Sequence, residues 1–107
     1  MIIIQYGSQV YEVRVIPEKD LFHDGESHSG HISHNKSTID ISAEWDQPGR
    51  KVILWHELIH AILSHSGRDG TIDEAVIESL AHGIVEILQR NNFLFDAVLN
   101  DEVPTWR

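Results

Sequence analysis

The segment Trp55-His-Glu-Leu-Ile-His60 places two histidines four residues apart, with a glutamate directly after the first. On a helix, positions i and i+4 share a face one turn apart, so His56 and His60 could both bind one metal ion about 2 Å away. Glu57 lies about 100° around the helix from His56, close enough to contact a metal-bound water but turned too far to be a third ligand. The pattern predicts a zinc site with a general base beside it.

A catalytic zinc site needs a third protein ligand and one position left for water. Glu74, Glu78 and His82 are spaced by four along one stripe of a predicted second helix. If the first helix ends about five residues after His60, a helix that folds back reaches the same height five or six residues in. Counted from Ile72, this position is residue 77 or 78, so we expect Glu78 to be the third ligand. By the same count Glu74 is too close to the turn and His82 is a turn too deep.

The helix that carries these histidines is predicted to lie in the middle of the fold. Residues from about 50 to 64 are apolar nearly all round, which is typical of a buried helix. Gln47-Pro48-Gly49 is expected to break the chain before it, and Gly67 to end it. Burying ionisable groups costs several kcal/mol unless each is paired or bound to a metal, so the context favours a metal site.

The second helix is predicted to begin at a capping box, in which Thr71 caps and Glu74 reaches back. It should run to about Arg90, with Asn91-Asn92 as its stop. Five of its residues share one face: Val76, Leu80, Gly83, Ile84 and Ile87. Residues 93–99 suggest a further short amphipathic turn or helix, and the tail 100–107 is expected to be loose.

Strands are predicted in the first part of the chain. Residues 2–16 form a hairpin around Gly7-Ser8, with Tyr11, Val13 and Val15 on one side of the second strand. Residues 18–30 are read as a loop, and residues 31–42 as a second hairpin with Ile39 and Ile41 inward. The expected fold class is α+β in a single domain, 1–107. A small antiparallel or mixed sheet of three to four strands (about 1–45) packs on the two helices (about 50–65 and 72–90).

The amino-acid composition limits the fold, the partners and the metal ligands that can be expected. The chain has 107 residues, 41% hydrophobic and 23% charged, which suits one small globular domain. Its formal charge of −9 makes nucleic acid and membrane surfaces poor partners. Without cysteine, any metal must be bound by His, Asp or Glu. The N-terminus does not resemble a signal peptide, so we expect a cytoplasmic protein.

Five further histidines are candidate metal ligands. His65 is a less favoured third ligand, since it follows His60 by five residues, and we expect it to cap the end of the first helix. His23, His28, His31 and His34 form a histidine-rich tract. Such tracts can bind metal, but the spacing does not converge on one ion in an extended chain. We therefore expect a solvated loop near the mouth of the site.

The stretch WHELIHAIL from Trp55, followed by DEAVIESLA from Asp73, resembles the small gluzincin-type metallopeptidases. These include the minigluzincins and the ImmA/IrrE-like and phage-encoded zinc peptidase domains. In these families a "glutamate helix" that follows the His-Glu-x-x-His helix supplies the third ligand, and the likeness covers about residues 38–90. It implies zinc on His56, His60 and Glu78, Glu57 as general base, and a substrate strand beside an edge of the sheet.

The function expected from these residues is a zinc-dependent metallopeptidase, in which Zn²⁺ activates a bound water, Glu57 takes its proton, and the substrate is a peptide or protein. His82 or His65 would be a second electrophile for the developing oxyanion. The alternative is a latent or catalytically silent metal-binding module, regulatory or phage-associated, of the same fold. Some minigluzincins resemble latent enzymes, and here Asp101-Glu102 in the tail could place a carboxylate on the zinc.

Overall fold

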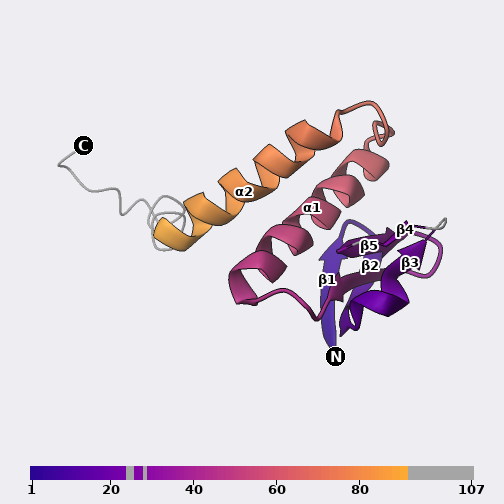
Figure 1. Ribbon diagram of the computed structural model, residues 1–107. Helices are drawn as coiled ribbons and strands as arrows, with labels where there is room; N and C mark the ends of the chain where they lie inside the picture. The colour runs from indigo at the N-terminus through magenta and orange to yellow at the C-terminus, as the bar shows by residue number, and fades with distance from the viewer. Residues whose placement is uncertain (24–25, 28, 92–107) are drawn as a thin grey trace.

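Four strands form the main sheet of the protein (Figure 1). The computed structural model describes the backbone of residues 1–23, 26–27 and 29–91, and the side chains of residues 1–21 and 29–91. The strand order is β1-β2-β6-β5, in which β2 and β6 are parallel and the other neighbours antiparallel. The strands are β1 (Ile2–Tyr6), β2 (Gln9–Ile16), β5 (Gly30–Ser33) and β6 (Thr38–Ser42).

Both predicted hairpins are confirmed. Tyr6 pairs with Gln9 across a two-residue turn in which Gly7 has φ 61°, a conformation that glycine adopts without steric cost. In the second hairpin Ile39 and Ile41 are buried, as predicted. Of the three residues predicted on one side of β2, Tyr11 is buried, whereas Val15 is exposed.

The segment 18–30 contains more structure than the loop that was predicted. Residues Glu18–Leu21 form a 3-10 helix, η1, whose Leu21 is buried. It is followed by a two-stranded pair, β3 (Phe22–His23) and β4 (Glu26–Ser27). Elements of two to four residues carry too little periodicity to stand out from a polar sequence.

Helix α1 (Gln47–His65) begins earlier than predicted. The carboxylate of Asp46 accepts a hydrogen bond from the backbone N–H of Gly49 at 3.0 Å, and so caps the helix. Pro48 lies in the first turn, where its missing N–H costs nothing, so residues 47–49 start the helix rather than break the chain. Gly67, with φ 73°, follows the C-cap Ser66, so the predicted end is confirmed.

Helix α2 (Glu74–Arg90) ends at the predicted position but is capped differently. Its N-cap is Asp73, whose carboxylate accepts a hydrogen bond from the backbone N–H of Ala75 at 2.7 Å. The predicted cap, Thr71, instead donates its hydroxyl to the carbonyl of Arg68. Glu74 is therefore the first residue of the helix and is not tied to a cap.

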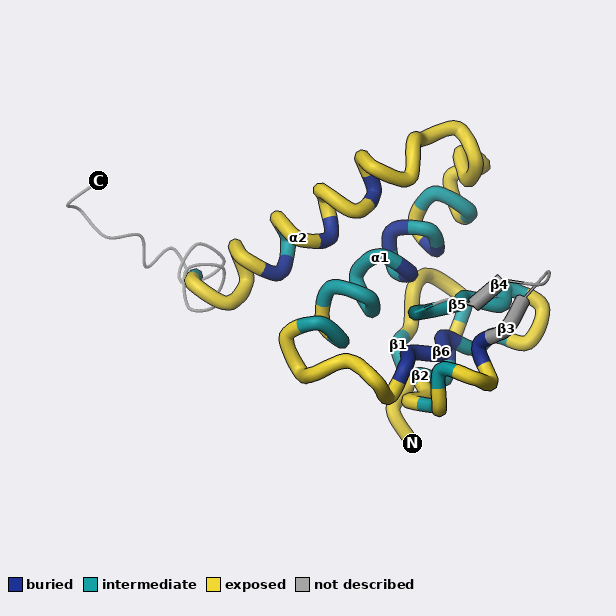
Figure 2. The backbone as a smooth tube through the Cα atoms, viewed as in Figure 1, coloured by how far each residue is buried: buried dark blue, intermediate teal, exposed yellow. Residues whose placement is uncertain are grey.

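Helix α1 lies between the sheet and α2, and its two sides carry two separate apolar contacts (Figures 1 and 2). The sheet side is built around the buried residues Tyr11, Ile39, Ile41 and Ala61. The α2 side is built around the buried residues Ile59, Ile77 and Ala81. Three of the five residues predicted to share one face of the second helix are largely exposed and are not part of this contact. Val76, Leu80 and Ile87 are 49%, 49% and 53% exposed.

Over the residues that the structure describes, the architecture is α+β, with a four-stranded mixed sheet and two α-helices, within the predicted class. Across the described ranges, neither helix is long and apolar enough to cross a membrane. The predicted element at 93–99 and the predicted loose tail at 100–107, including Asp101 and Glu102, lie outside the described residues.

Candidate metal and active site

His56 and His60 lie one turn apart on α1, with ring centroids 5.1 Å apart. Their side chains are 20% and 18% exposed, so both rings are mostly shielded from water but reachable from the surface. Glu57, between them in sequence, is buried, with 7% of its surface exposed. A Cβ added to Gly30 of β5 would lie 3.2 Å from Oε2 of Glu57, so this carboxylate faces the edge strand.

Glu74 brings a carboxylate to both imidazoles. Its Oε2 lies 3.0 Å from Nε2 of His56, and its Oε1 lies 3.0 Å from Nε2 of His60. The three residues form a group that could hold a metal ion, with one ligand atom from each and all three atoms within 4.8 Å of one another. Two imidazole nitrogens and a carboxylate oxygen are a donor set that suits zinc.

The predicted third ligand, Glu78, lies on the other side of His56. Its Oε2 is 2.7 Å from Nδ1 of His56, the ring nitrogen that points away from Glu74. The group that could hold a metal ion thus contains Glu74, where the sequence predicted Glu78. The count from Ile72 did not lead to Glu74 because it assumed that the two helices fold back at equal heights, whereas Glu74, the first residue of α2, already reaches His60.

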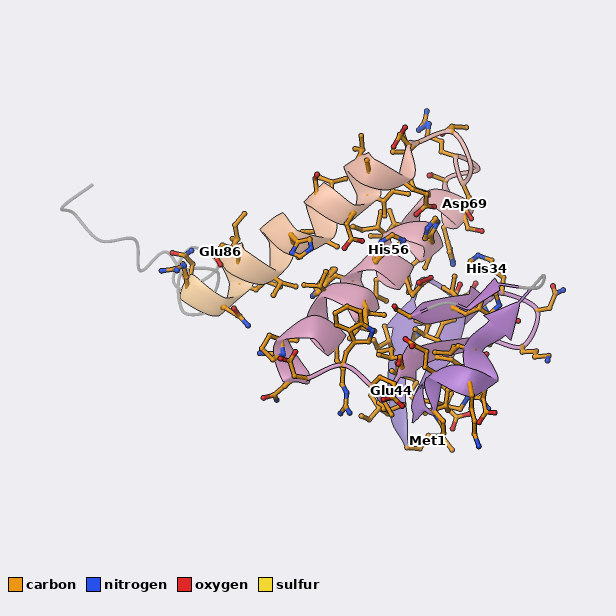
Figure 3. The ribbon with its side chains drawn as sticks, viewed as in Figure 1. Met1, His34, Glu44, His56, Asp69 and Glu86 are labelled. Atoms are coloured by element: carbon orange, nitrogen blue, oxygen red, sulfur yellow. The ribbon has the colours of Figure 1, made fainter. Side chains whose placement is uncertain are left out.

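Asp69, in the connection between the helices, contacts His60 in the same way. Its Oδ1 lies 2.9 Å from Nδ1 of His60. Figure 3 labels His56 on α1 and Asp69 near the end of the same helix. Each histidine therefore has one carboxylate at Nδ1 and shares a second, that of Glu74, at Nε2.

This arrangement has an electrostatic consequence. A neutral imidazole has a single N–H, so it can donate to only one of the two carboxylates that it faces. The other nitrogen then presents a lone pair to a carboxylate oxygen, a repulsion that either a second proton or a cation would relieve. Burial lowers the pKa of His60, but the hydrogen bond to Asp69 and the charges of Glu74 and Glu57 outweigh it, so the pKa is raised above 6.5.

Two cavities flank the group and share Gly30, His56 and Glu57. One, of about 370 Å³, has a partly apolar wall that includes Trp45, Val52 and Ile53. The other, of about 510 Å³, is lined by polar groups that include His31, His34 and Asp69. Strand β5 ends the sheet, and among the described residues no strand pairs with its outer edge. The carboxylate of Glu57 is thus reached from two cavities that border an edge strand.

His82 and His65, the two residues proposed as second electrophile, occupy different places. His82 lines the smaller cavity, and its Nε2 lies 3.2 Å from Oε1 of Glu78. His65 is the last residue of α1, and its ring meets that of Tyr6 edge-on with centroids 4.5 Å apart. The structure brings His82, and not His65, to the cavity that Glu57 lines.

Two histidines of the tract lie in the predicted second hairpin but are less exposed than a solvated loop would be. His31 belongs to β5 and His34 to the turn after it; both are partly buried and line the larger cavity. His34 Nδ1 is 3.1 Å from the hydroxyl of Tyr11. The side chains of His23 and His28 are outside the described residues.

Comparisons of the chain with models of protein families, with curated proteins and with solved structures find no match. A function for this chain is therefore inferred from the geometry of the residues around His56 and His60.

Proposed function

We propose that this protein is a zinc-dependent peptidase that holds its metal with His56, His60 and Glu74. The observation that carries the proposal is that both imidazoles face carboxylates at both ring nitrogens. Protonating both rings would relieve the repulsion only by placing two cations side by side, with centroids 5.1 Å apart. One divalent cation held by His56, His60 and Glu74 would relieve it without that cost.

The distances are close to those that this ion needs. Adjacent ligand atoms of a tetrahedral zinc site lie about 3.3 Å apart when the metal–ligand bonds are about 2 Å long. Each oxygen of Glu74 lies 3.0 Å from one Nε2 atom, and one oxygen and the two nitrogens lie within 4.8 Å of one another, so binding one ion requires the side chains to move slightly closer together. Three protein ligands also match a catalytic site, in which a fourth position is kept for water, better than a closed structural site, which has four protein ligands.

When bound, zinc supplies Lewis acidity, which lowers the pKa of a coordinated water and polarises a carbonyl. Glu57 takes a proton from the attacking water and passes it to the leaving amine. Its burial, at 7% exposure, shields the carboxylate from bulk water. His82, in the same cavity, is the candidate donor to the developing oxyanion.

The substrate is expected to bind along the edge strand β5. An extended peptide can add to a free strand edge through backbone hydrogen bonds, while cavities on either side receive its side chains. Gly30, which both cavities share, keeps the strand close to the helix, because a Cβ there would come within 2.5 Å of Ile53 Cγ2. A peptide bound along β5 would therefore pass directly over Glu57. The proposal also accords with the resemblance to gluzincin-type peptidases.

Glu57→Gln tests the proposal. The variant should bind zinc with the same stoichiometry as the natural protein and cleave an unstructured protein substrate about 10²- to 10⁴-fold more slowly, the usual contribution of a general base. Glu86→Gln is the matched control, because Glu86 pairs with Arg90 on the exposed side of α2. Its activity should not change.

Each other outcome has a definite meaning. Natural protein that holds no zinc contradicts the proposal. Zinc-loaded protein that cleaves nothing supports the alternative, a latent or regulatory metal-binding module. Equal cleavage by the natural protein and by Glu57→Gln would show that this glutamate is not the base.

A further inference from the structure

The connection between α1 and α2 folds back onto the end of α1. The backbone N–H of Arg68 donates to the carbonyl of Leu63 at 2.7 Å, so the chain reverses direction directly after α1. Gly67 and Gly70, with φ 73° and 86°, stand on either side of this segment in a conformation that other residues rarely adopt. Asp69, between the two glycines, is thereby brought to His60.

The contact of Asp69 with His60 favours one tautomer of the ring. A carboxylate can only accept, so Asp69, at 2.9 Å from Nδ1, favours a neutral His60 with its proton on Nδ1 and its lone pair on Nε2. Nε2 is the atom that faces Glu74. A histidine that binds a metal through one nitrogen is commonly oriented by a carboxylate at the other.

Asp69 differs from the carboxylate that contacts the other histidine. Glu78 divides its oxygens between Nδ1 of His56 and Nε2 of His82. It also lies on α2, whereas Asp69 lies in the connection that joins the two helices. Asp69 is therefore the residue that joins this connection to the metal group.

We infer that Asp69 is a positioning residue for the metal: it holds His60 in the tautomer and orientation that direct Nε2 toward the ion. The inference relies on the metal site of the proposed function, but not on peptide cleavage. It also assigns a role to the glycine-flanked connection, which the His-Glu-x-x-His pattern does not include.

The test compares three variants by their zinc affinity, measured in competition with a chromophoric chelator. Asp69→Ala should bind zinc about 10- to 100-fold more weakly, the usual cost of losing such a partner. Asp69→Asn keeps an acceptor oxygen and should lose less. Asp73→Asn is the matched control: it removes one negative charge from the same connection, and asparagine caps a helix as well as aspartate does. Its affinity should stay within about twofold of the natural value.

A second readout does not involve the metal. In the metal-free protein at alkaline pH, ¹⁵N NMR of the imidazole of His60 should report a proton on Nδ1, and this preference should be lost in Asp69→Ala. Circular dichroism verifies that each variant is folded.

The failures of the two proposals are distinguishable. If the natural protein binds zinc and Asp69→Ala binds it equally well, the role of Asp69 is overturned while the zinc site stands. If Asp73→Asn weakens binding as much as Asp69→Ala, charge alone is responsible, and the positioning role is again overturned. If the natural protein binds no zinc, the proposed function itself fails.

Discussion

The two sides of α1 are held in different ways. Its sheet side contacts two neighbouring strands, β5 and β6, and closes over the buried residues Tyr11, Ile39 and Ile41. Its α2 side contacts a single helix that leaves much of its own surface to solvent, as the yellow tube of α2 in Figure 2 shows. The polar groups of the site lie mainly on this second side. We infer that apolar burial fixes the first side, and that the second depends in addition on the metal.

The largest effect is expected on the sheet side. Ile39 is fully buried between the sheet and α1, so Ile39→Ala should lower the free energy of unfolding by about 2–5 kcal/mol. The measurement is denaturant unfolding followed by circular dichroism. A loss below about 1 kcal/mol would mean that this core does not carry the fold.

Zinc should stabilise the α2 side. At a zinc concentration 100 times the dissociation constant, binding adds about 2.7 kcal/mol to the free energy of unfolding. Hydrogen exchange should slow most in α2, because Glu74 ties the first turn of α2 to α1.

Two matched variants sharpen this expectation. Glu74→Gln should lose the stabilisation, whereas Glu78→Gln should keep it at a higher zinc concentration, since Glu78 contacts only the far nitrogen of His56. Loss of stabilisation in Glu78→Gln and its retention in Glu74→Gln would reverse the assignment of the third ligand.

A smaller effect is expected from the apolar contact of α2. Ile77→Ala removes a buried side chain between the helices and should cost about 2 kcal/mol, the low end of the usual range, because α2 can shift toward α1 to close the gap. Amide exchange should increase in α2 and stay unchanged in β2 and β6. Uniform acceleration across the protein would show that the two sides of α1 unfold together.

The smallest effect concerns pH. Burial raises the pKa of Tyr11 above its ordinary value of 10.0. The folded state thus favours the neutral phenol, and this contribution to stability is complete below pH 10 and is lost as the pH rises through the higher folded value. Tyr11→Phe should lose less stability than the natural protein between pH 9 and pH 11, as thermal unfolding would detect. Identical pH profiles would contradict this.

Much of the fold could be predicted because its signals are local. The Gly7-Ser8 turn, the alternation in residues 38–42 and the apolar run after Arg50 each depend on neighbours in sequence. The exposure of Val76, Leu80 and Ile87 could not be predicted, since an apolar stripe does not reveal whether another element covers it.

The residues of the candidate site also fall into those that local sequence predicts and those that it does not. His56, Glu57 and His60 are found from spacing alone, since one helix sets their geometry. Glu74 was excluded because the predicted capping box, with Thr71 as the cap, used its side chain at the end of the helix, whereas Asp73 is the cap. Asp69 has no pattern that marks it, because its approach to His60 depends on how the chain turns at Gly67 and Gly70. Contacts between elements follow from such turns, which short-range periodicity does not encode.

A crystal structure of the zinc-loaded protein, with anomalous scattering at the zinc edge, tests the central claim most directly. We expect one strong anomalous peak about 2 Å from Nε2 of His56, Nε2 of His60 and a carboxylate oxygen of Glu74. Glu78 and Asp69 should remain at the Nδ1 atoms of the two rings. A peak coordinated by Glu78 through the Nδ1 side, or no peak at these histidines at all, would contradict the account.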